Sequence, residues 1–160
     1  MMLSRINKFF EFDPFESKMK KSAGIIIVLN KSKFLLCHPS NSRWFGTYSF
    51  PKGGIEEGES ALDAALRELR EETSVIVSKN QILDIKNPIV VYYENKKGTK
   101  YKSITLYTVH INDVSEIGLD SEVIPKERLQ IEEIDWAGFL DKEQARAKIF
   151  HKTASVLETF

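Results

Sequence analysis

Net charge, cysteine and long apolar segments are all scarce in this sequence. The 23 basic and 23 acidic residues balance, so no overall positive field would hold DNA, RNA or an anionic membrane. The one cysteine, Cys37, cannot form an internal disulfide, which suits a reducing cytoplasm. The longest apolar run, Ala23 to Leu29, is far shorter than the roughly 20 residues that cross a bilayer. We therefore expect a cytoplasmic protein that binds neither membrane nor DNA and makes only local contacts with nucleotides.

The length of 160 residues suits one domain, since domains commonly have about 100 to 200 residues. We expect an N-terminal arm over residues 1–20 and a single domain over residues 21–160. Within the arm, Glu11, Asp13 and Pro14 interrupt the phenylalanines, so no apolar signal-peptide segment is expected. The arm either docks its aromatic side chains on the domain or is partly disordered.

Hydrophobic periodicity and turn residues predict the order of the elements. Helices are expected over residues 61–73, where Ser60 and Asp63 resemble a capping box, and from Asp141, as N-cap, to residue 160. Residues 112–127 read as an acidic, loop-like insertion. Strands are expected over residues 23–29, 33–37, 48–50, 88–94, 99–111 and 129–136. This order predicts an α/β sandwich in which a mixed sheet lies between helices.

Three acidic residues, Glu68, Glu71 and Glu72, crowd the predicted central helix. At about 100° per residue they share one arc beside the apolar face, and like charges at this spacing destabilise a helix. Arg67 can pair with Glu71, which leaves Glu68 and Glu72 largely without a local cation. A bound Mg²⁺ or Mn²⁺ would stabilise them, because hard divalent cations prefer carboxylate oxygens. The alternative is a solvated acidic face.

A glycine-containing loop precedes this helix and favours the metal-site interpretation. Lys52, Gly53 and Gly54 follow Pro51, and Gly58 comes shortly after. Such a loop can turn sharply and approach a ligand closely with its backbone.

The loop and helix together resemble the signature of the Nudix hydrolases. The match is Gly53, five residues, Glu59, seven residues and then RELREETSV over residues 67–75. It departs from the family at one position, where Ser74 stands in place of glycine. Because that glycine ends the helix, serine should require a different C-cap. A weaker likeness in strand order and terminal helix extends over residues 21–160.

The resemblance implies a role for each matched residue. Glu68, Glu71 and Glu72 would bind the metal together with the backbone carbonyl of Lys52, and Glu59 would pair with Arg67. The implied reaction is metal-dependent hydrolysis of a nucleoside diphosphate linked to another group. Glu68 itself could be the general base, or a carboxylate of a later loop could serve. The later candidates are Glu116, Glu122, Glu132 and Glu133.

The stretch WFGTYSFPKGG, residues 44–54, resembles that of dinucleoside polyphosphate hydrolases and, less closely, of enzymes that act on RNA 5′ ends. Dinucleoside polyphosphates are therefore the expected substrates, with Lys52, Gly53 and Gly54 as substrate-binding residues. The alternatives are RNA 5′ ends, ADP-ribose or nucleoside triphosphates, and a module that binds nucleotide without turnover. Candidates for stacking on a base are Trp44, Tyr92, Tyr93, Tyr101, Tyr107 and Phe139, and candidates for binding phosphate are Arg43, Lys96, Lys97, Lys100 and Lys102. His38 is expected to be a loop residue at the end of a strand.

Overall fold

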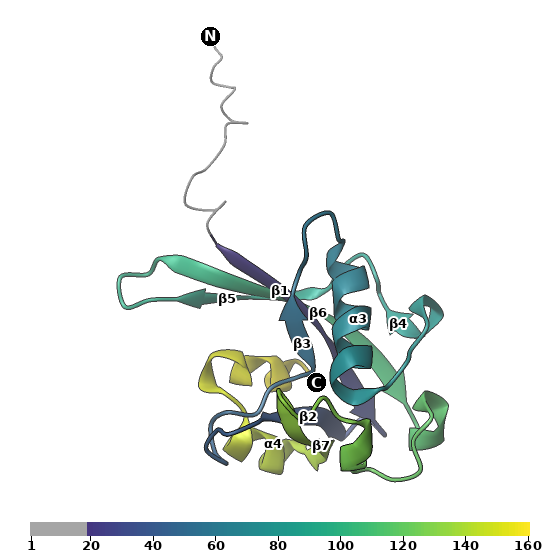
Figure 1. Cartoon of the computed structure of the whole chain (residues 1–160). Coiled ribbons are helices and arrows are strands. Elements are labelled where there is room, and N and C mark those ends of the chain that lie inside the picture. The colour runs from purple at the N-terminus through teal and green to yellow at the C-terminus, as the bar shows by residue number, and fades with distance from the viewer. Residues whose placement is uncertain (1–18) are drawn as a thin grey trace.

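The computed structural model of the protein describes residues 19–160, so the predicted N-terminal arm lies almost entirely outside the described residues. A seven-stranded mixed sheet forms the centre of this part of the chain (Figure 1). The strands are β1 (Lys20–Leu29), β2 (Lys33–Pro39), β3 (Lys52–Gly54), β4 (Ile82–Leu83), β5 (Ile89–Glu94), β6 (Lys100–Ile111) and β7 (Ile134–Asp141). The α-helices are α3 (Ala61–Thr73) and α4 (Lys142–Lys148), and 3₁₀ turns are η1 (Lys79–Gln81), η2 (Val114–Ile117), η3 (Lys126–Arg128) and η4 (His151–Thr159).

Strand β1 lies at the centre of the sheet and is buried on both faces. It runs parallel to β6 on one side and antiparallel to β2 on the other, in the order β4-β6-β1-β2-β7. Its side chains alternate between two cores, as the two-residue period of a strand requires. Ile25 and Ile27 face the core beneath α3, whereas Ile26 and Val28 face the core beneath α4 and η4. The predicted sandwich of helix, mixed sheet and helix is confirmed.

Helix α3 begins and ends at the residues predicted from the sequence. Ser60 is the N-cap, and its side chain accepts a hydrogen bond from the backbone N–H of Asp63 at 3.0 Å. Ala64, Ala65 and Leu69 are fully buried against β1. Capping and one apolar face together fix this helix on the sheet.

Several elements differ from the sequence predictions. β1 begins at Lys20, β2 extends through His38 to Pro39, so His38 is a strand residue rather than a loop residue, and β4 lies where no strand was expected. The segment 48–50 makes only isolated bridges, with Ser49 opposite Cys37, and the strand lies instead at β3, within the predicted loop. The last strand begins at Ile134 rather than at residue 129, because Glu133 and Ile134 both donate to the carbonyl of Gln130 in a turn.

The terminal helix is also shorter than predicted. Asp141 caps α4 as expected, through a hydrogen bond from Gln144 N–H to its carboxylate at 2.8 Å. The helix ends at Lys148 because the next residue, Ile149, is extended and bridges to Tyr48. The chain then continues as the 3₁₀ turns of η4 rather than as one helix to residue 160. Neither α3 nor α4, nor any other described helix, has the length and apolar character to cross a membrane.

The expectation of a different C-cap at Ser74 is wrong. Ser74 adopts the left-handed conformation that glycine usually provides, with φ 63° and ψ 13°, and its N–H donates to the carbonyl of Arg70. The serine hydroxyl donates to the carbonyl of Arg128 at 2.6 Å, and the Arg128 guanidinium donates back to the Ser74 carbonyl at 2.9 Å. These two bonds offset the strain of a side chain in this conformation.

Substitution of Ser74 separates these two contributions. We expect Ser74→Ala to lower the free energy of unfolding by about 1 kcal/mol, because the hydroxyl bond is lost and the left-handed strain remains. Ser74→Gly should lie within about 0.5 kcal/mol of the wild type, since glycine relieves the strain that the lost bond offset. Urea denaturation of the three proteins checks this. Equal losses in both variants would show that the hydroxyl bond alone matters.

Candidate active site

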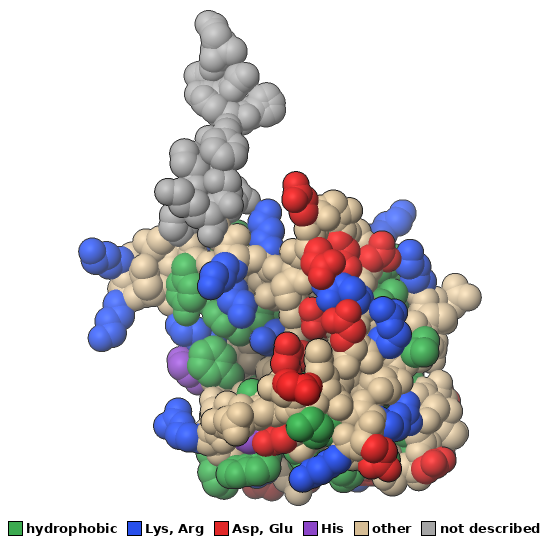
Figure 2. Space-filling model, in the orientation of Figure 1, with side chains coloured by type: hydrophobic (Ala, Val, Ile, Leu, Met, Phe, Trp, Pro, Cys, Tyr) green, Lys and Arg blue, Asp and Glu red, His purple; other side chains and the backbone are tan. Residues whose placement is uncertain are grey.

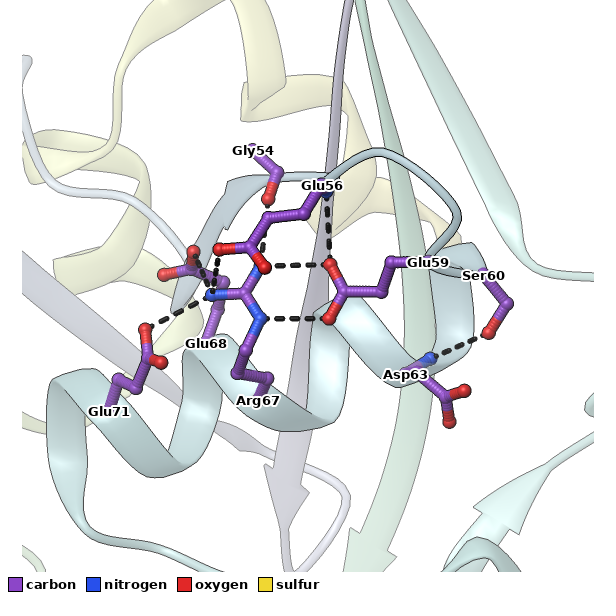
Figure 3. Close-up of polar contacts among 8 residues, drawn as sticks. All are labelled: Gly54, Glu56, Glu59, Ser60, Asp63, Arg67, Glu68 and Glu71. Atoms are coloured by element: carbon purple, nitrogen blue, oxygen red, sulfur yellow. Dashed lines mark hydrogen bonds and ion pairs between the residues drawn. The ribbon is translucent and has the colours of Figure 1, made fainter.

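The guanidinium of Arg67 lies at the centre of the polar network on α3 (Figure 3). Its Nε and Nη2 donate to the two carboxylate oxygens of Glu59, at 2.8 and 3.0 Å. Nη2 also donates to the Gly54 carbonyl at 2.9 Å, and Nη1 donates to Glu68 at 2.9 Å and Glu71 at 3.1 Å. One side chain therefore fastens the loop 54–59 to the helix and holds two of the clustered carboxylates.

The pairing of Glu59 with Arg67, which the family resemblance implied, is present as a two-pronged ion pair. The hydrogen bonds from Arg67 and from the backbone N–H of Glu56 lower the pKa of Glu59 to about 2. The same pairing raises the pKa of Arg67, so both groups stay charged at neutral pH. This ion pair therefore fixes the loop to the helix and does not exchange protons.

The expectation that Glu68 lacks a local cation is wrong, because Arg67 reaches it as well as Glu71. Glu68 folds back onto the loop, where a Cβ built on Gly53 would lie only 2.1 Å from its carboxylate carbon. Burial raises the pKa of Glu68 despite the opposing effect of Arg67. Only glycine at position 53 leaves room for this carboxylate beside the backbone.

Glu72 is the buried carboxylate of the cluster, with 6% of its surface exposed. The backbone N–H of Lys52 donates to its Oε1 at 3.3 Å. Burial, followed by the negative charge of Glu68, raises the pKa of Glu72 to about 8. A carboxylate in such surroundings is stabilised in its charged form by a nearby cation.

The residues around Lys52 fit a hard divalent cation. Glu68 lies against the Gly53 backbone and Glu72 accepts from the Lys52 N–H, so both place carboxylate oxygens here, and oxygen is the donor that Mg²⁺ and Mn²⁺ prefer. Within residues 19–160, however, no three acidic, histidine or cysteine side chains converge on one point. Nη1 of Arg67 instead binds both Glu68 and Glu71, at 2.9 and 3.1 Å.

The four later acidic residues lie in different places. Glu116 accepts from the N–H groups of Asn112 and Asp113 and caps η2, and Glu122 pairs with Lys33 at 2.8 Å. Glu133 lines a cavity of about 310 Å³ together with Lys52, Gly53, Gly54 and Glu72. Its charge contributes to the raised pKa values of Glu68 and Glu72, which places it beside the cluster. Glu132, its exposed neighbour, does not line this cavity.

A larger cavity of about 630 Å³ adjoins the first and shares Pro39, Ser49, Lys52 and Lys102 with it. It is both basic and aromatic. Burial, and then the charges of Lys52 and Lys20, lower the pKa of Lys102, so the three lysines repel one another. A polyanion between them would relieve this repulsion. The aromatic members of the wall are Tyr93, Tyr101 and Phe150.

Figure 2 shows the same division of charge on the molecular surface. Acidic side chains gather over α3, and basic side chains lie over the β5–β6 hairpin on the left, with apolar side chains in between. The larger cavity is lined by Lys102 of β6, which pairs with β5 in this hairpin, and by Lys52, whose backbone N–H donates to Glu72.

The structure shows which of the aromatic and basic candidates line the larger cavity, which the sequence could not decide. Tyr107 and Phe139 are buried in the core beneath α3, and Trp44 lies over His38. Tyr93, Tyr101 and Lys102 line the larger cavity. Tyr92 and Lys100 do not line it, and Nζ of Lys100 lies 4.3 Å from the ring centroid of Tyr92. Sequence reasoning missed Lys20 and Phe150, which come from the first strand and the C-terminal segment. Pairing of β1 with β6 sets Lys20 opposite Lys102, and the N–H of Phe150 donates to the carbonyl of Tyr48.

Comparison with known proteins identifies related chains. A family model for the NUDIX domain matches residues 18–158. The mRNA-decapping protein g5R of African swine fever virus is 27% identical over 142 residues, which cover 84% of this chain and 57% of the viral protein. The RNA pyrophosphohydrolase of Dinoroseobacter shibae is 58% identical over 36 residues, 22% of each chain. The chain spans between 22% and 62% of the length of the curated relatives that it matches.

Solved structures share the fold over nearly the whole chain. A C. elegans Ap4A hydrolase in a binary complex superposes with a TM-score of 0.62 and 26% identity, and the match covers 89% of this chain and 95% of that one.

Alanine substitution of the two loop glycines tests the contact between Glu68 and the backbone. Gly53→Ala should weaken Mn²⁺ binding by about 10-fold or more, because its Cβ would displace the Glu68 carboxylate. Gly54→Ala is the matched control, since a Cβ there meets nothing within 4 Å. Electron paramagnetic resonance titration with Mn²⁺ measures both. Equal affinities in the two variants would contradict this placement of Glu68.

Proposed function

The chain belongs to the Nudix family, and from this premise we propose that it is a metal-dependent pyrophosphohydrolase acting on dinucleoside polyphosphates. The observation that carries the proposal is the pair of joined cavities, one lined by Glu72 and Glu133 and the other by lysines and aromatic side chains. A nucleotide that carries a phosphate chain needs both surfaces at once. The likeness to a C. elegans Ap4A hydrolase supports this substrate class.

Lys20, Lys52 and Lys102 bind the phosphate chain in this proposal. They surround one cavity and already repel one another, so a polyanion gains attraction and removes their repulsion. Tyr93, Tyr101 and Phe150 offer ring faces on which a base can stack. The phosphate chain then extends from Lys102 through Lys52, which both cavities share, toward the carboxylates.

Glu68, Glu71, Glu72 and the Lys52 carbonyl would hold Mg²⁺ or Mn²⁺. When bound, the cation polarises the scissile phosphate and acidifies the attacking water. Arg67 and Glu59 take no part in proton transfer, because their mutual ion pair keeps both charged. Their role is to hold the loop and the carboxylates in place.

Glu133 is the proposed general base. It comes from the loop before β7 rather than from α3, and it faces the cavity lined by Glu72 and Lys52. An ionised carboxylate there can accept a proton from water that attacks the phosphate chain. Of the alternatives, Glu116 and Glu122 are engaged elsewhere, and Glu68 is engaged with Arg67.

RNA 5′ ends are the second candidate substrate. Relatives named as an mRNA-decapping protein and as RNA pyrophosphohydrolases favour it. The β5–β6 hairpin also carries Lys96, Lys97 and Lys100, and its strands supply Tyr93, Tyr101 and Lys102 to the larger cavity. The larger cavity would hold the first nucleotide in either case. A substrate panel separates the two, because an RNA enzyme should prefer a chain of several nucleotides to a free dinucleoside polyphosphate.

The proposal is tested by turnover on diadenosine polyphosphates, ADP-ribose, nucleoside triphosphates and 5′-triphosphate RNA, with Mg²⁺ and with Mn²⁺. We expect metal-dependent hydrolysis of diadenosine polyphosphates with the highest kcat/KM. Glu133→Gln should lower kcat by about 10²- to 10⁴-fold, and its matched control Glu132→Gln should stay within about twofold. Nucleotide binding without turnover on any substrate would instead indicate a binding module.

The role of the basic cavity is tested by two lysine variants on the same strand. Lys102→Gln should raise KM by about 10-fold or more while kcat changes little, because a charged contact with phosphate is lost. Lys100→Gln is the matched control, since Lys100 is exposed and lies outside the cavity. Equal KM values for these two variants would contradict phosphate binding by Lys102.

A further inference from the structure

Strand β7 contains one extra residue next to the proposed base. Opposite β2, His38 pairs with Trp136 and Pro39 pairs with Ile134, so the intervening Asp135 has no partner in the ladder. This is a β-bulge, a feature that often re-aims a side chain beside an active site. Glu133 lies two residues before the bulged position, so the direction of the chain at Asp135 determines where Glu133 points.

A buried histidine holds the side chain of the bulged residue. Nδ1 of His38 lies 2.6 Å from Oδ1 of Asp135, and Nε2 lies 2.7 Å from the carbonyl of Arg43. Both partners are acceptors. The imidazolium, which donates from both nitrogens, satisfies both of them, whereas a neutral ring can satisfy only one.

Trp44 covers this histidine. The two rings are stacked, with centroids 3.9 Å apart and an angle of 6° between their planes. His38 is 1% exposed, whereas Trp44 is 52% exposed, so the indole lies between the imidazole and the solvent. The stacked indole therefore covers one face of the imidazole and restricts its position.

Ser40, the residue after β2, makes two further hydrogen bonds to the loop that carries Glu133. The N–H of Ser40 donates to the carbonyl of Glu133 at 2.9 Å, and the Ser40 hydroxyl donates to the carbonyl of Ile131 at 2.6 Å. On its other side, the loop is tied to α3 by a bond from Gln130 N–H to the Glu72 carbonyl at 3.1 Å. The backbone that carries Glu133 is therefore held between β2 and the helix of the carboxylate cluster.

We propose that His38, through its bond to Asp135 beneath Trp44, is a positioning residue that fixes the bulge and so directs Glu133 toward the cavity. The inference rests on the proposed function, which assigns proton transfer to Glu133. His38 itself does not reach either cavity, so it acts only through the loop.

A double-mutant cycle tests the coupling. His38→Gln should lower kcat by about 10- to 100-fold with KM within about twofold, because the base is misplaced while the lysine cavity is intact. In a Glu133→Gln background the same substitution should lower kcat no further. Independent, multiplicative losses would overturn the proposal, as would a lower Tm with unchanged kcat.

A pair of surface variants keeps the test valid if His38→Gln does not fold. Trp44→Ala removes the covering ring and should lower kcat by several-fold, again only when Glu133 is present. Phe45→Ala is the matched control, because Phe45 is the next residue, is 64% exposed and does not contact His38. Equal kcat values for Trp44→Ala and Phe45→Ala would count against the proposal.

A measurement by nuclear magnetic resonance needs no turnover. Amide exchange at Ser40, which reports the bond to the Glu133 carbonyl, should accelerate in Trp44→Ala and not in Phe45→Ala. If the wild type hydrolyses no substrate, the proposed function fails, and unchanged exchange at Ser40 would separately overturn the positioning role.

Discussion

The guanidinium of Arg67 is the constraint on which the carboxylate cluster depends. Three acidic residues on one arc of α3 repel one another, and Arg67 is the cation that the structure places among them. Because the same group also binds Glu59 and the Gly54 carbonyl, the charge that stabilises the helix also closes the preceding loop over it. The loop in turn brings the Lys52 backbone N–H to Glu72. Arg67 thus links the acidic residues of α3 to the loop that precedes the helix.

The lysines of the larger cavity are brought together by the central strand of the sheet, β1. β1 pairs with β3, which carries Lys52 and Gly53, and with β6, which carries Lys102. Gly24 allows the close approach, since a Cβ there would lie 2.4 Å from the Pro51 carbonyl. Lys20 begins the same strand, so three lysines from distant parts of the sequence meet at one edge of the carboxylate cluster. The joined acidic and basic cavities follow from this pairing.

Local sequence signals predicted the parts of the molecule that depend on local interactions. Helix α3 was found to the residue because capping by Ser60 and the spacing of Ala65 and Leu69 are encoded within one segment. The acidic cluster was found for the same reason, and the resemblance supplied the pairing of Glu59 with Arg67. Contacts across the sheet could not be found in this way. His38 and Asp135 are 97 residues apart, and α4 ends early because Ile149 bridges to Tyr48. No periodicity within either segment records such a partner.

Two elements supply the acidic side chains around Lys52, and hydrogen bonds tie these elements together. α3 carries Glu68, Glu71 and Glu72, whereas Glu133 belongs to the loop between η3 and β7. Gln130 N–H donates to the Glu72 carbonyl, and Ser74, the C-cap of α3, makes two hydrogen bonds with Arg128. Ser40, which follows β2, donates its N–H to the Glu133 carbonyl. The negative charge of Glu133 also contributes to the raised pKa values of Glu68 and Glu72. The carboxylates of the helix and of the loop are therefore coupled both through the backbone and through their charges.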